Sequence, residues 1–297
     1  MRILFVTSNR LGDAVLSTGL LDHLIRTHPE ARITVVCGPV AEGVFARMPN
    51  RERTIVLSKQ KWGLHWLPLW AETLTHFWDL VVDIRGSALS WLVPTRRRAV
   101  FHRVTGPKIA QLGAILGLTP PPAPVAWTSQ VDRDRVANLL PFGSPILVVA
   151  PTANWDPKVW PADRFAAVFH RLATPATVPV VLGGPGAVER AMAAPLLALL
   201  PEAIDLVGQL TLPEVVACLE RAGLFIGNDS GLMHLSAAAG TPTIGLFGPT
   251  DAATYAPTGR LATAVIGSSM AAITVDQVVA AAKRLLGDIA PLPGDRA

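Results

Sequence analysis

The chain has little charge, few cysteines and no long apolar run. Only 16% of its 297 residues are charged, half are apolar, and the mean hydropathy is +0.39, so a large core can form. Even so, no apolar run reaches the roughly 18–20 residues that a helix needs to span a bilayer. The apolar run Ile3–Thr7 is also too short for a secretion signal. We therefore expect a cytoplasmic protein.

Other features exclude further classes. Cys37 and Cys218 lack CxxC spacing and lie in apolar surroundings, which favours buried free thiols over a metal site. No GxGxxG motif follows the first apolar run, and this argues against a dinucleotide oxidoreductase. The net charge of +4 with a pI of about 9.5 is too weak to indicate nucleic-acid binding without a dense basic stripe. It fits anionic small molecules or an anionic lipid surface.

Strand and helix patterns alternate twice along the chain, which predicts an α/β protein with two parallel, doubly wound, Rossmann-like domains facing across a cleft. We place an N-terminal domain at 1–140, a C-terminal domain at 141–287 and a loose tail at 288–297. The predicted strands are Arg2–Thr7, Ile33–Cys37, Thr54–Leu57, Leu80–Ile84, Ile146–Ala150, Val178–Leu182, Ile204–Leu206, Leu224–Gly227 and Thr243–Phe247. The predicted helices are Ala14–Thr27, Val40–Met48, Leu67–Phe77, Asp132–Leu140, Phe165–Leu172, Ala187–Leu200, Leu212–Arg221, Leu232–Ala239 and Val275–Leu286.

The most informative stretch is LFIGNDSGLMHLSAAAGTPTIGLFGPT, residues 224–250. It predicts a strand, a tight polar turn and a helix whose first N–H groups carry the positive end of the helix dipole. Asp229 and Ser230 can cap this helix, and Gly231 lets a ligand approach the backbone. Such a turn suits a phosphate or diphosphate. It is equally the ordinary turn of an open α/β sheet, and the spacing does not separate the two interpretations.

Four segments together carry a family resemblance. They are RILFVTSNRLGDAVLSTGLLDHLIRTHPEARITVVCGP at the start, Lys158-Val159-Trp160-Pro161 with Phe165 behind it, Leu182-Gly183-Gly184-Pro185 followed by Glu189, and NDSGLMHLSAAAGTPTIGLFGPT. In order and spacing they resemble glycosyltransferase family 9, the heptosyltransferases that use ADP-heptose to build the lipopolysaccharide core. The resemblance implies a GT-B fold, with the sugar nucleotide on the C-terminal half and the acceptor on the N-terminal half.

Asp13 follows the first strand, in the turn that we expect at the mouth of the cleft. The resemblance implies that it is the catalytic base, which takes the proton of the acceptor hydroxyl during an inverting transfer. The alternative is an acid that stabilises the start of a helix through the dipole. The acceptor-side residues of the same loop are Ser8, Asn9, Arg10 and Gly12.

Lys158 follows a strand and precedes a Trp-Pro pair. The resemblance implies that it contacts the phosphates, where an ammonium would stabilise the leaving nucleoside diphosphate; most lysines are simply solvated. Thr152 adds a hydroxyl to the same phosphates, and Glu214 is expected to bind the ribose hydroxyls. The remaining nucleotide-sugar residues are expected to be Asp229, Ser230, Gly231, Leu232 and His234.

No metal is required by this scheme, and no cofactor is expected. Asp132-Arg133-Asp134 has the DxD form that holds metal–nucleotide complexes elsewhere, but it lies at a predicted helix start, where acids are favoured by the dipole. Trp62, Trp66 and Trp70 recur every four residues beside Lys59 and Lys61, and Arg96-Arg97-Arg98 follows Trp91. This pattern is typical of a membrane interface or of a phosphorylated, lipid-linked acceptor, although core packing explains the tryptophans as well.

We therefore predict an inverting, metal-independent glycosyltransferase that moves a sugar, heptose from ADP-heptose by the resemblance, onto a lipopolysaccharide core or related cell-envelope acceptor. Its partners would be the nucleotide sugar, a lipid-linked saccharide and the cytoplasmic face of an anionic inner membrane, and it would be a monomer. Two alternatives stay open: a GT-B-like nucleotide-sugar epimerase and a non-catalytic protein that binds envelope saccharides.

Overall fold

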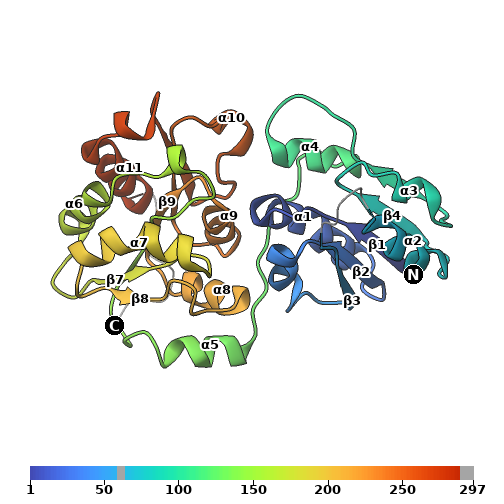
Figure 1. Ribbon diagram of the computed structural model, residues 1–297, viewed down its shortest axis with the longest axis horizontal. Helices are drawn as coiled ribbons and strands as arrows, with labels where there is room; N and C mark the ends of the chain where they lie inside the picture. Colours follow the sequence, from blue (N-terminus) through green and yellow to red (C-terminus); the bar gives the residue numbers. More distant parts are fainter. Residues whose placement is uncertain (59–63, 288–297) are drawn as a thin grey trace. The chain divides into compact units, whose positions relative to one another are not determined.

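The computed structural model describes residues 1–58 and 64–287 and divides the chain into two compact units, Met1–Ser129 and Gln130–Ala297 (Figure 1). Each unit builds its own sheet, and the strand pairs of both sheets are parallel within the described residues. The predicted α/β fold with two doubly wound parallel sheets is therefore confirmed. The Lys59, Trp62 and Lys61 positions and the predicted tail 288–297 lie outside the described residues.

The first unit has five strands in the order β3-β2-β1-β4-β5. Its strands are β1 Arg2–Val6, β2 Arg32–Cys37, β3 Arg51–Val56, β4 Leu80–Asp83 and β5 Arg98–Val100. Its helices are α1 Leu11–Thr27, the 3₁₀ helix η1 Pro39–Phe45, α2 Trp66–Leu74, α3 Leu89–Leu92 and α4 Lys108–Ile115. The central strands are apolar on both faces because helices cover both faces: α1 and α4 lie on one side and α2 and α3 on the other (Figure 1).

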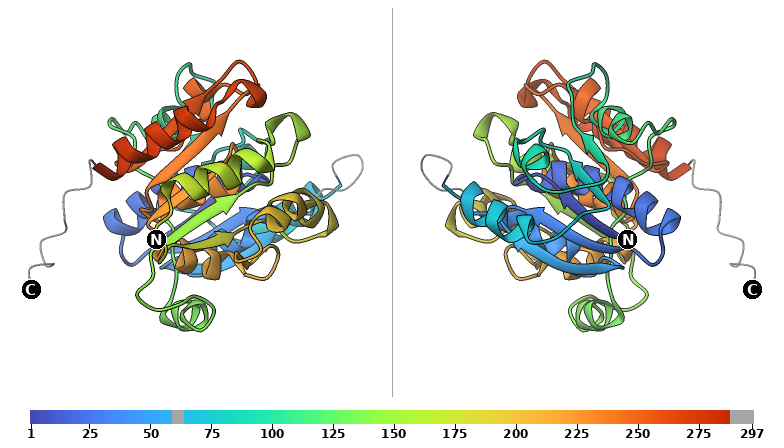
Figure 2. Two further views of the ribbon diagram at one scale, coloured as in Figure 1. Left: turned by 90° about the vertical axis from the view of Figure 1, so that its left-hand side faces the viewer. Right: turned by 90° about the vertical axis from the view of Figure 1, so that its right-hand side faces the viewer.

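The second unit has six strands in the order β11-β10-β9-β6-β7-β8. Its strands are β6 Ile146–Ala150, β7 Val178–Val181, β8 Ile204–Asp205, β9 Leu224–Asn228, β10 Thr243–Phe247 and β11 Ala262–Ile266. Its helices are α5 Gln130–Ala137, η3 Asp156–Lys158, α6 Ala162–Leu172, α7 Ala187–Leu199, α8 Leu212–Glu220, α9 Gly231–Ala238, α10 Ala252–Tyr255, η4 Met270–Ala272 and α11 Val275–Gly287. Helices α6, α7 and α11 pack together, and Figure 2 shows α11 beside the strands of this sheet.

Both sheets reverse their strand order at one point. In the first unit the chain winds outward from β1 in one direction and then crosses to β4 on its other side; in the second it winds outward from β6 and crosses to β9. At such a switch point the connections after the two central strands leave in opposite directions, and a crevice opens at the carboxyl edge of the sheet. The loops after β1 and β4, and those after β6 and β9, are therefore the places where each unit can hold a ligand.

Several element boundaries differ from the sequence predictions. Helix α1 begins at Leu11, so Asp13 lies in its first turn and not in the preceding turn. An α-helix was predicted over Val40–Met48, but the structure has a 3₁₀ helix there, over Pro39–Phe45. Strands β5 and β11 and helix α4 were not predicted, because their short segments show no clear periodicity. The first compact unit ends at Ser129, before the boundary at 140 that was predicted, because helix α5 packs against α8 and so belongs to the second unit.

Candidate functional site

An ion pair stands at the carboxyl edge of the second sheet, at its switch point. Lys158, on the loop after β6, places its Nζ 2.6 Å from Oδ2 of Asp229, the first residue after β9. Both side chains are mostly shielded, with 18% of Lys158 and 9% of Asp229 exposed. The fold thus brings together two predicted site residues that are 71 positions apart in the chain.

Asn228 holds this arrangement in place. Its side chain is fully buried; Oδ1 accepts a hydrogen bond from the Trp160 N–H at 3.1 Å, and Nδ2 donates to the Pro151 carbonyl at 2.8 Å. The Trp160 ring is itself buried and donates from Nε1 to the Ile273 carbonyl. Both ends of the segment that carries Lys158 are therefore tied to the end of β9, and this fixes the lysine beside Asp229.

Helix α9 begins directly beyond the ion pair and presents its first N–H groups. Ser230 occupies the N-cap position, but among the described residues no side-chain cap bond is made to this helix. The predicted capping by Asp229 or Ser230 is therefore wrong: the Asp229 carboxylate pairs with Lys158, and Ser230 Oγ is buried with no hydrogen-bond partner in the described part of the chain. The uncapped start of α9 therefore directly follows the Lys158–Asp229 pair, and the N-terminus of a helix is a place where an anion can bind.

Three further predicted residues lie around this point. Thr152 is buried just after β6, and its methyl group packs so closely on the backbone of Gly183 that a Cβ there would lie 3.2 Å from Cγ2. Leu232 and His234 are buried within α9. Nearby, Glu189 accepts a hydrogen bond from the Gly184 N–H at 3.1 Å, so it orders the turn after β7.

Glu214 has structural partners at the start of α8. It forms a capping box with Thr211, accepting from the Thr211 N–H at 2.7 Å and from the hydroxyl at 2.9 Å. Its other oxygen lies 2.7 Å from Arg135 Nε. Both carboxylate oxygens are engaged, which accounts for its burial. Binding of ribose hydroxyls by Glu214 stays a prediction, and it would require these bonds to be exchanged.

The switch point of the first sheet carries a second polar group. Asp13 is half-buried in the first turn of α1, where the Ser8 hydroxyl donates to its Oδ2 at 3.4 Å; the Arg10 N–H in turn donates to Ser8 Oγ at 3.1 Å. Gly12, in the same turn, is half-buried. The structure therefore brings Asp13, Ser8 and the Arg10 backbone into one loop.

The loop after β4 adds a residue that the sequence analysis missed. Arg85 donates from Nη1 to Oδ1 of Asn9 at 3.2 Å, and its guanidinium lies 5.1 Å from the ring centre of Trp66. Asp83 fixes this loop, because its buried carboxylate accepts from the Arg85 N–H at 2.8 Å and from the Ser87 N–H and hydroxyl. Arg85 was identifiable in principle, since it follows a buried strand just as Asp13 and Lys158 do.

Other sequence motifs resolve more simply. Within residues 1–58 and 64–287, no group of three or more His, Cys, Asp or Glu side chains is arranged to hold a metal ion. In the Asp132-Arg133-Asp134 motif, Arg133 pairs with Glu220 at 2.9 Å and Asp134 accepts from Gln130. Over the same residues, no helix is both long enough and apolar enough to cross a bilayer.

Comparisons with known proteins identify the family of the chain. Residues 95–283 match glycosyltransferase family 9 (heptosyltransferase). The chain is 36% identical to the Escherichia coli lipopolysaccharide heptosyltransferase 3 over 111 residues, a match that spans 37% of this chain and only 33% of that protein. It is 28% identical to lipopolysaccharide heptosyltransferase 1 of Pseudomonas aeruginosa over 84% of this chain and 79% of the relative.

Among solved structures, the E. coli ADP-heptose lipopolysaccharide heptosyltransferase II superposes with a TM-score of 0.79 at 21% identity, covering 96% of this chain and 98% of that one. At this identity the likeness concerns the fold, and it confirms the predicted GT-B type of two-domain fold. The protein is a glycosyltransferase. More particularly, because the family match extends over well over half of the chain, it belongs to glycosyltransferase family 9.

Proposed function

We propose that this protein transfers a heptosyl group from ADP-heptose to a lipopolysaccharide core or related envelope acceptor, with inversion and without a metal ion. The observation that carries the proposal is the Lys158–Asp229 pair, 2.6 Å apart beside the open N-terminus of α9. A diphosphate needs several converging donors and positive charge, and this edge of the second sheet supplies both.

In the proposed donor site the diphosphate lies against the first turn of α9. The Lys158 ammonium exchanges part of its bond to Asp229 for a phosphate oxygen, and Ser230 Oγ donates to another. As the bond from the anomeric carbon to the diphosphate oxygen breaks, negative charge grows on that oxygen. The ammonium and the helix N–H groups stabilise it more strongly in the transition state than in the bound donor, which accelerates the reaction.

Asp13 is the proposed base on the first unit. Its carboxylate takes the proton of the acceptor hydroxyl while the hydroxyl oxygen attacks the anomeric carbon and the nucleoside diphosphate leaves from the opposite side. One displacement of this kind inverts the anomeric configuration. The Ser8 hydroxyl donates to Asp13 Oδ2 in the structure, which ties the carboxylate to the loop after β1. Asn9, Arg10, Gly12 and Arg85 would then contact the acceptor.

The relatives support the donor and the acceptor class. Their names specify lipopolysaccharide heptosyltransferases, and the solved enzyme with the similar fold is named for ADP-heptose. We extend this to a cytoplasmic monomer that meets its lipid-linked acceptor at the inner membrane. Size-exclusion chromatography with light scattering tests the monomer, and a dimer at micromolar concentration would contradict it.

Calorimetric titration with ADP, UDP, GDP and CMP tests the donor site. We expect selective binding of ADP that is lost in Asp229→Ala and retained in Glu202→Ala, a control that removes an exposed acid elsewhere in the second unit. Selective binding of UDP or GDP would overturn the donor. An absence of nucleotide binding at millimolar concentration would overturn the catalytic proposal and favour a saccharide-binding protein.

Turnover assays complete the test. With ADP-heptose and a core saccharide, NMR of the product should show the inverted anomer, and EDTA should leave the rate unchanged. Conversion of ADP-heptose to an epimer in the absence of any acceptor would instead identify an epimerase.

A further inference from the structure

Helix α2 has apolar residues on two faces. Leu69 and Thr73 point into the core of the first unit, where Leu69 is only 2% exposed. On the other side Leu67, Trp70 and Leu74 follow the i, i+3, i+7 spacing of a single stripe, and they are exposed by 60%, 37% and 41%. The second stripe is not covered by the core of the first unit, and exposed apolar stripes of this kind mark a contact with a partner or with lipid.

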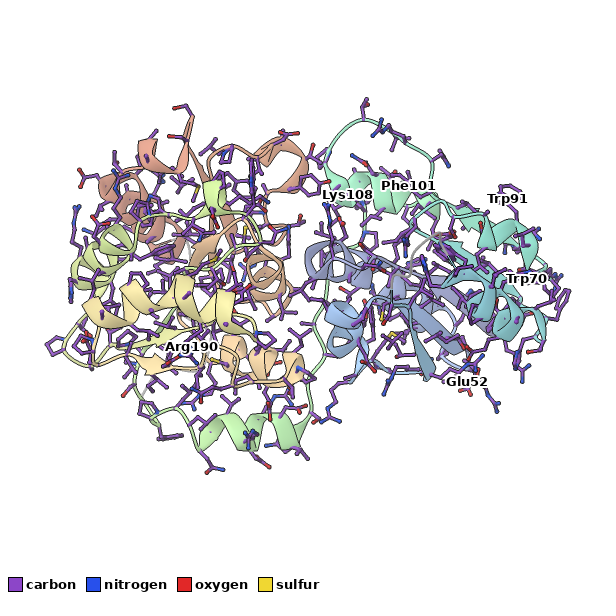
Figure 3. The ribbon with its side chains drawn as sticks, in the orientation of Figure 1. Glu52, Trp70, Trp91, Phe101, Lys108 and Arg190 are labelled. Atoms are coloured by element: carbon purple, nitrogen blue, oxygen red, sulfur yellow. The ribbon has the colours of Figure 1, made fainter. Side chains whose placement is uncertain are left out.

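Helix α3 extends this stripe. Trp91 and Leu92 are exposed by 66% and 58%, and the Trp70 indole donates to the Leu92 carbonyl at 3.0 Å, which joins the two helices. Figure 3 shows Trp70 and Trp91 near one another along this edge of the first unit. We name the set of Leu67, Trp70, Leu74, Trp91 and Leu92 the α2–α3 surface.

Positive charge borders the α2–α3 surface. Arg98 lies with its guanidinium 5.8 Å from the ring centre of Trp91 and donates to the Ser90 and Val93 carbonyls, so it is held against α3. Arg96 and Arg97 are exposed and form no ion pair within the described residues. The nearby acid Glu72 is neutralised by Arg53 at 2.7 Å. The border is therefore basic, with its charge available to a partner.

We infer that the α2–α3 surface docks on an anionic lipid bilayer. Exposed Trp and Leu side chains beside exposed arginines match the boundary between acyl chains and anionic headgroups, where tryptophan is enriched and each basic residue adds attraction. A second copy of the chain fits less well, because a two-fold interface over the same patch would bring the arginines of both copies into one interface and repel them.

Docking here would also serve the acceptor site. Trp66, the first residue of α2, stacks under Arg85, and Arg85 donates to Asn9 of the loop that leads to Asp13. A bilayer bound along α2 would thus lie one side chain away from the acceptor loop. The benefit to the acceptor site rests on the proposed function, since it exists only if the acceptor is linked to lipid. The docking of the α2–α3 surface on a bilayer does not rest on that function.

Flotation with vesicles tests the inference. We expect the full chain to float with vesicles of phosphatidylcholine and phosphatidylglycerol, and to float far less with phosphatidylcholine alone. Trp91→Ser combined with Leu67→Ser should abolish flotation, and Arg96→Glu with Arg97→Glu should weaken it by about fivefold or more per arginine, an effect that rising salt masks.

Matched controls give the test its specificity. Phe142→Ser removes a fully exposed aromatic residue of the second unit, and Lys283→Glu with Arg284→Glu reverses two exposed charges on α11; both should float like the unmodified protein. Because all substituted side chains are exposed, melting temperatures should agree. Flotation that is absent, or that is lost equally in the controls, overturns the inference, as does a dimer that Trp91→Ser converts to monomers.

A soluble acceptor separates this inference from the proposed function. Transfer to a delipidated core saccharide should proceed equally in the α2–α3 variants and the unmodified protein, whereas transfer to vesicle-embedded acceptor should fall. If no sugar is transferred to either acceptor but the protein still floats, the proposed function fails and the docking stands.

Discussion

The carboxyl edges of the two sheets differ in how tightly their polar side chains are held. In the second unit Lys158 and Asp229 are mostly shielded and lie 2.6 Å apart, and the buried Asn228 locks the loop that carries the lysine. In the first unit Ser8 and Asn9 are half-buried, Arg10 is exposed, and the contacts of Asp13 and Asn9 are longer, at 3.4 and 3.2 Å.

This difference follows the chemistry that each edge is proposed to perform. Enzymes that use the same nucleotide sugar have the same diphosphate leaving group. A rigid, preorganised site is then an advantage, because it stabilises the charge on that group without rearranging. An acceptor differs in size and charge from enzyme to enzyme, and loosely held loops can adapt to it. The family match covers nearly all of the second unit and residues 95–129 of the first.

The largest expected effect concerns the base. Asp13→Asn should lower kcat by about a thousandfold, because a positioned general base contributes roughly 10²–10⁴-fold. ADP binding should be unchanged, since the substitution lies in the other unit. Asp22→Asn, on the outer part of the same helix, should retain activity. A kcat for Asp13→Asn within a factor of three of the unmodified enzyme would reduce Asp13 to a helix-stabilising acid.

Lys158 should come next. Lys158→Met should lower kcat by about a hundredfold and weaken the binding of ADP, because the substitution removes the positive charge that faces the leaving phosphate. Lys158→Arg should restore part of both. Steady-state kinetics and calorimetry measure the two effects, and a Lys158→Met variant that binds ADP normally would show that the pair with Asp229 is purely structural.

Asn228 tests whether the second edge is preorganised by its buried hydrogen bonds. Asn228→Ala leaves the Trp160 N–H and the Pro151 carbonyl without their partner, and should lower the free energy of unfolding by about 2 kcal/mol. Urea denaturation measures this, with exposed Asn138→Ala as the control. Equal stability of the two variants would mean that the loop carrying Lys158 is held by other contacts.

Arg85 tests the looser edge. Arg85→Ala should raise the KM for the acceptor by about fivefold, because the variant lacks one exposed cation that would contact an anionic saccharide. The affinity for ADP should be unchanged. Arg32→Ala, at the amino edge of the same sheet, is the matched control. If the kinetics of both variants are alike, Arg85 only braces Asn9.

The smallest effect concerns the two thiols. Burial raises the pKa of Cys37 and of Cys218 from 9.0 to about 12, and Glu42 adds to the shift of Cys37. Above pH 9 the thiols lose their protons in the unfolded chain but keep them in the folded protein. The free energy of unfolding therefore does not depend on these thiols below pH 9 and falls as the pH rises from 9 toward 12. Neither thiol should react with iodoacetamide at pH 8 in the folded protein, and both should react in urea. Rapid labelling of either in the native state would show that its surroundings open.

Much of the fold was determined by the sequence itself. Continuous apolar runs such as Ile146–Ala150 and Thr243–Phe247 coincide with strands β6 and β10, because strands buried on both faces leave no room for polar residues. Position after such runs, together with the family resemblance, made Lys158, Asp229 and Asp13 candidate site residues, since the carboxyl ends of parallel strands meet at one edge. Their roles stay predictions.

The tertiary structure alone decided which of these residues meet and which side chains are already engaged. The β6–β9 pairing and the Asn228 hydrogen bonds bring Lys158 and Asp229 together, and Glu214 is held by Arg135, a residue of another helix. The prediction that Asp229 caps α9 was wrong for the same reason: its carboxylate pairs with Lys158, which comes from a distant loop. Exposure of Trp70 and Trp91 likewise depends on how α2 and α3 pack, and periodicity cannot distinguish an apolar face that is buried from one that is left open.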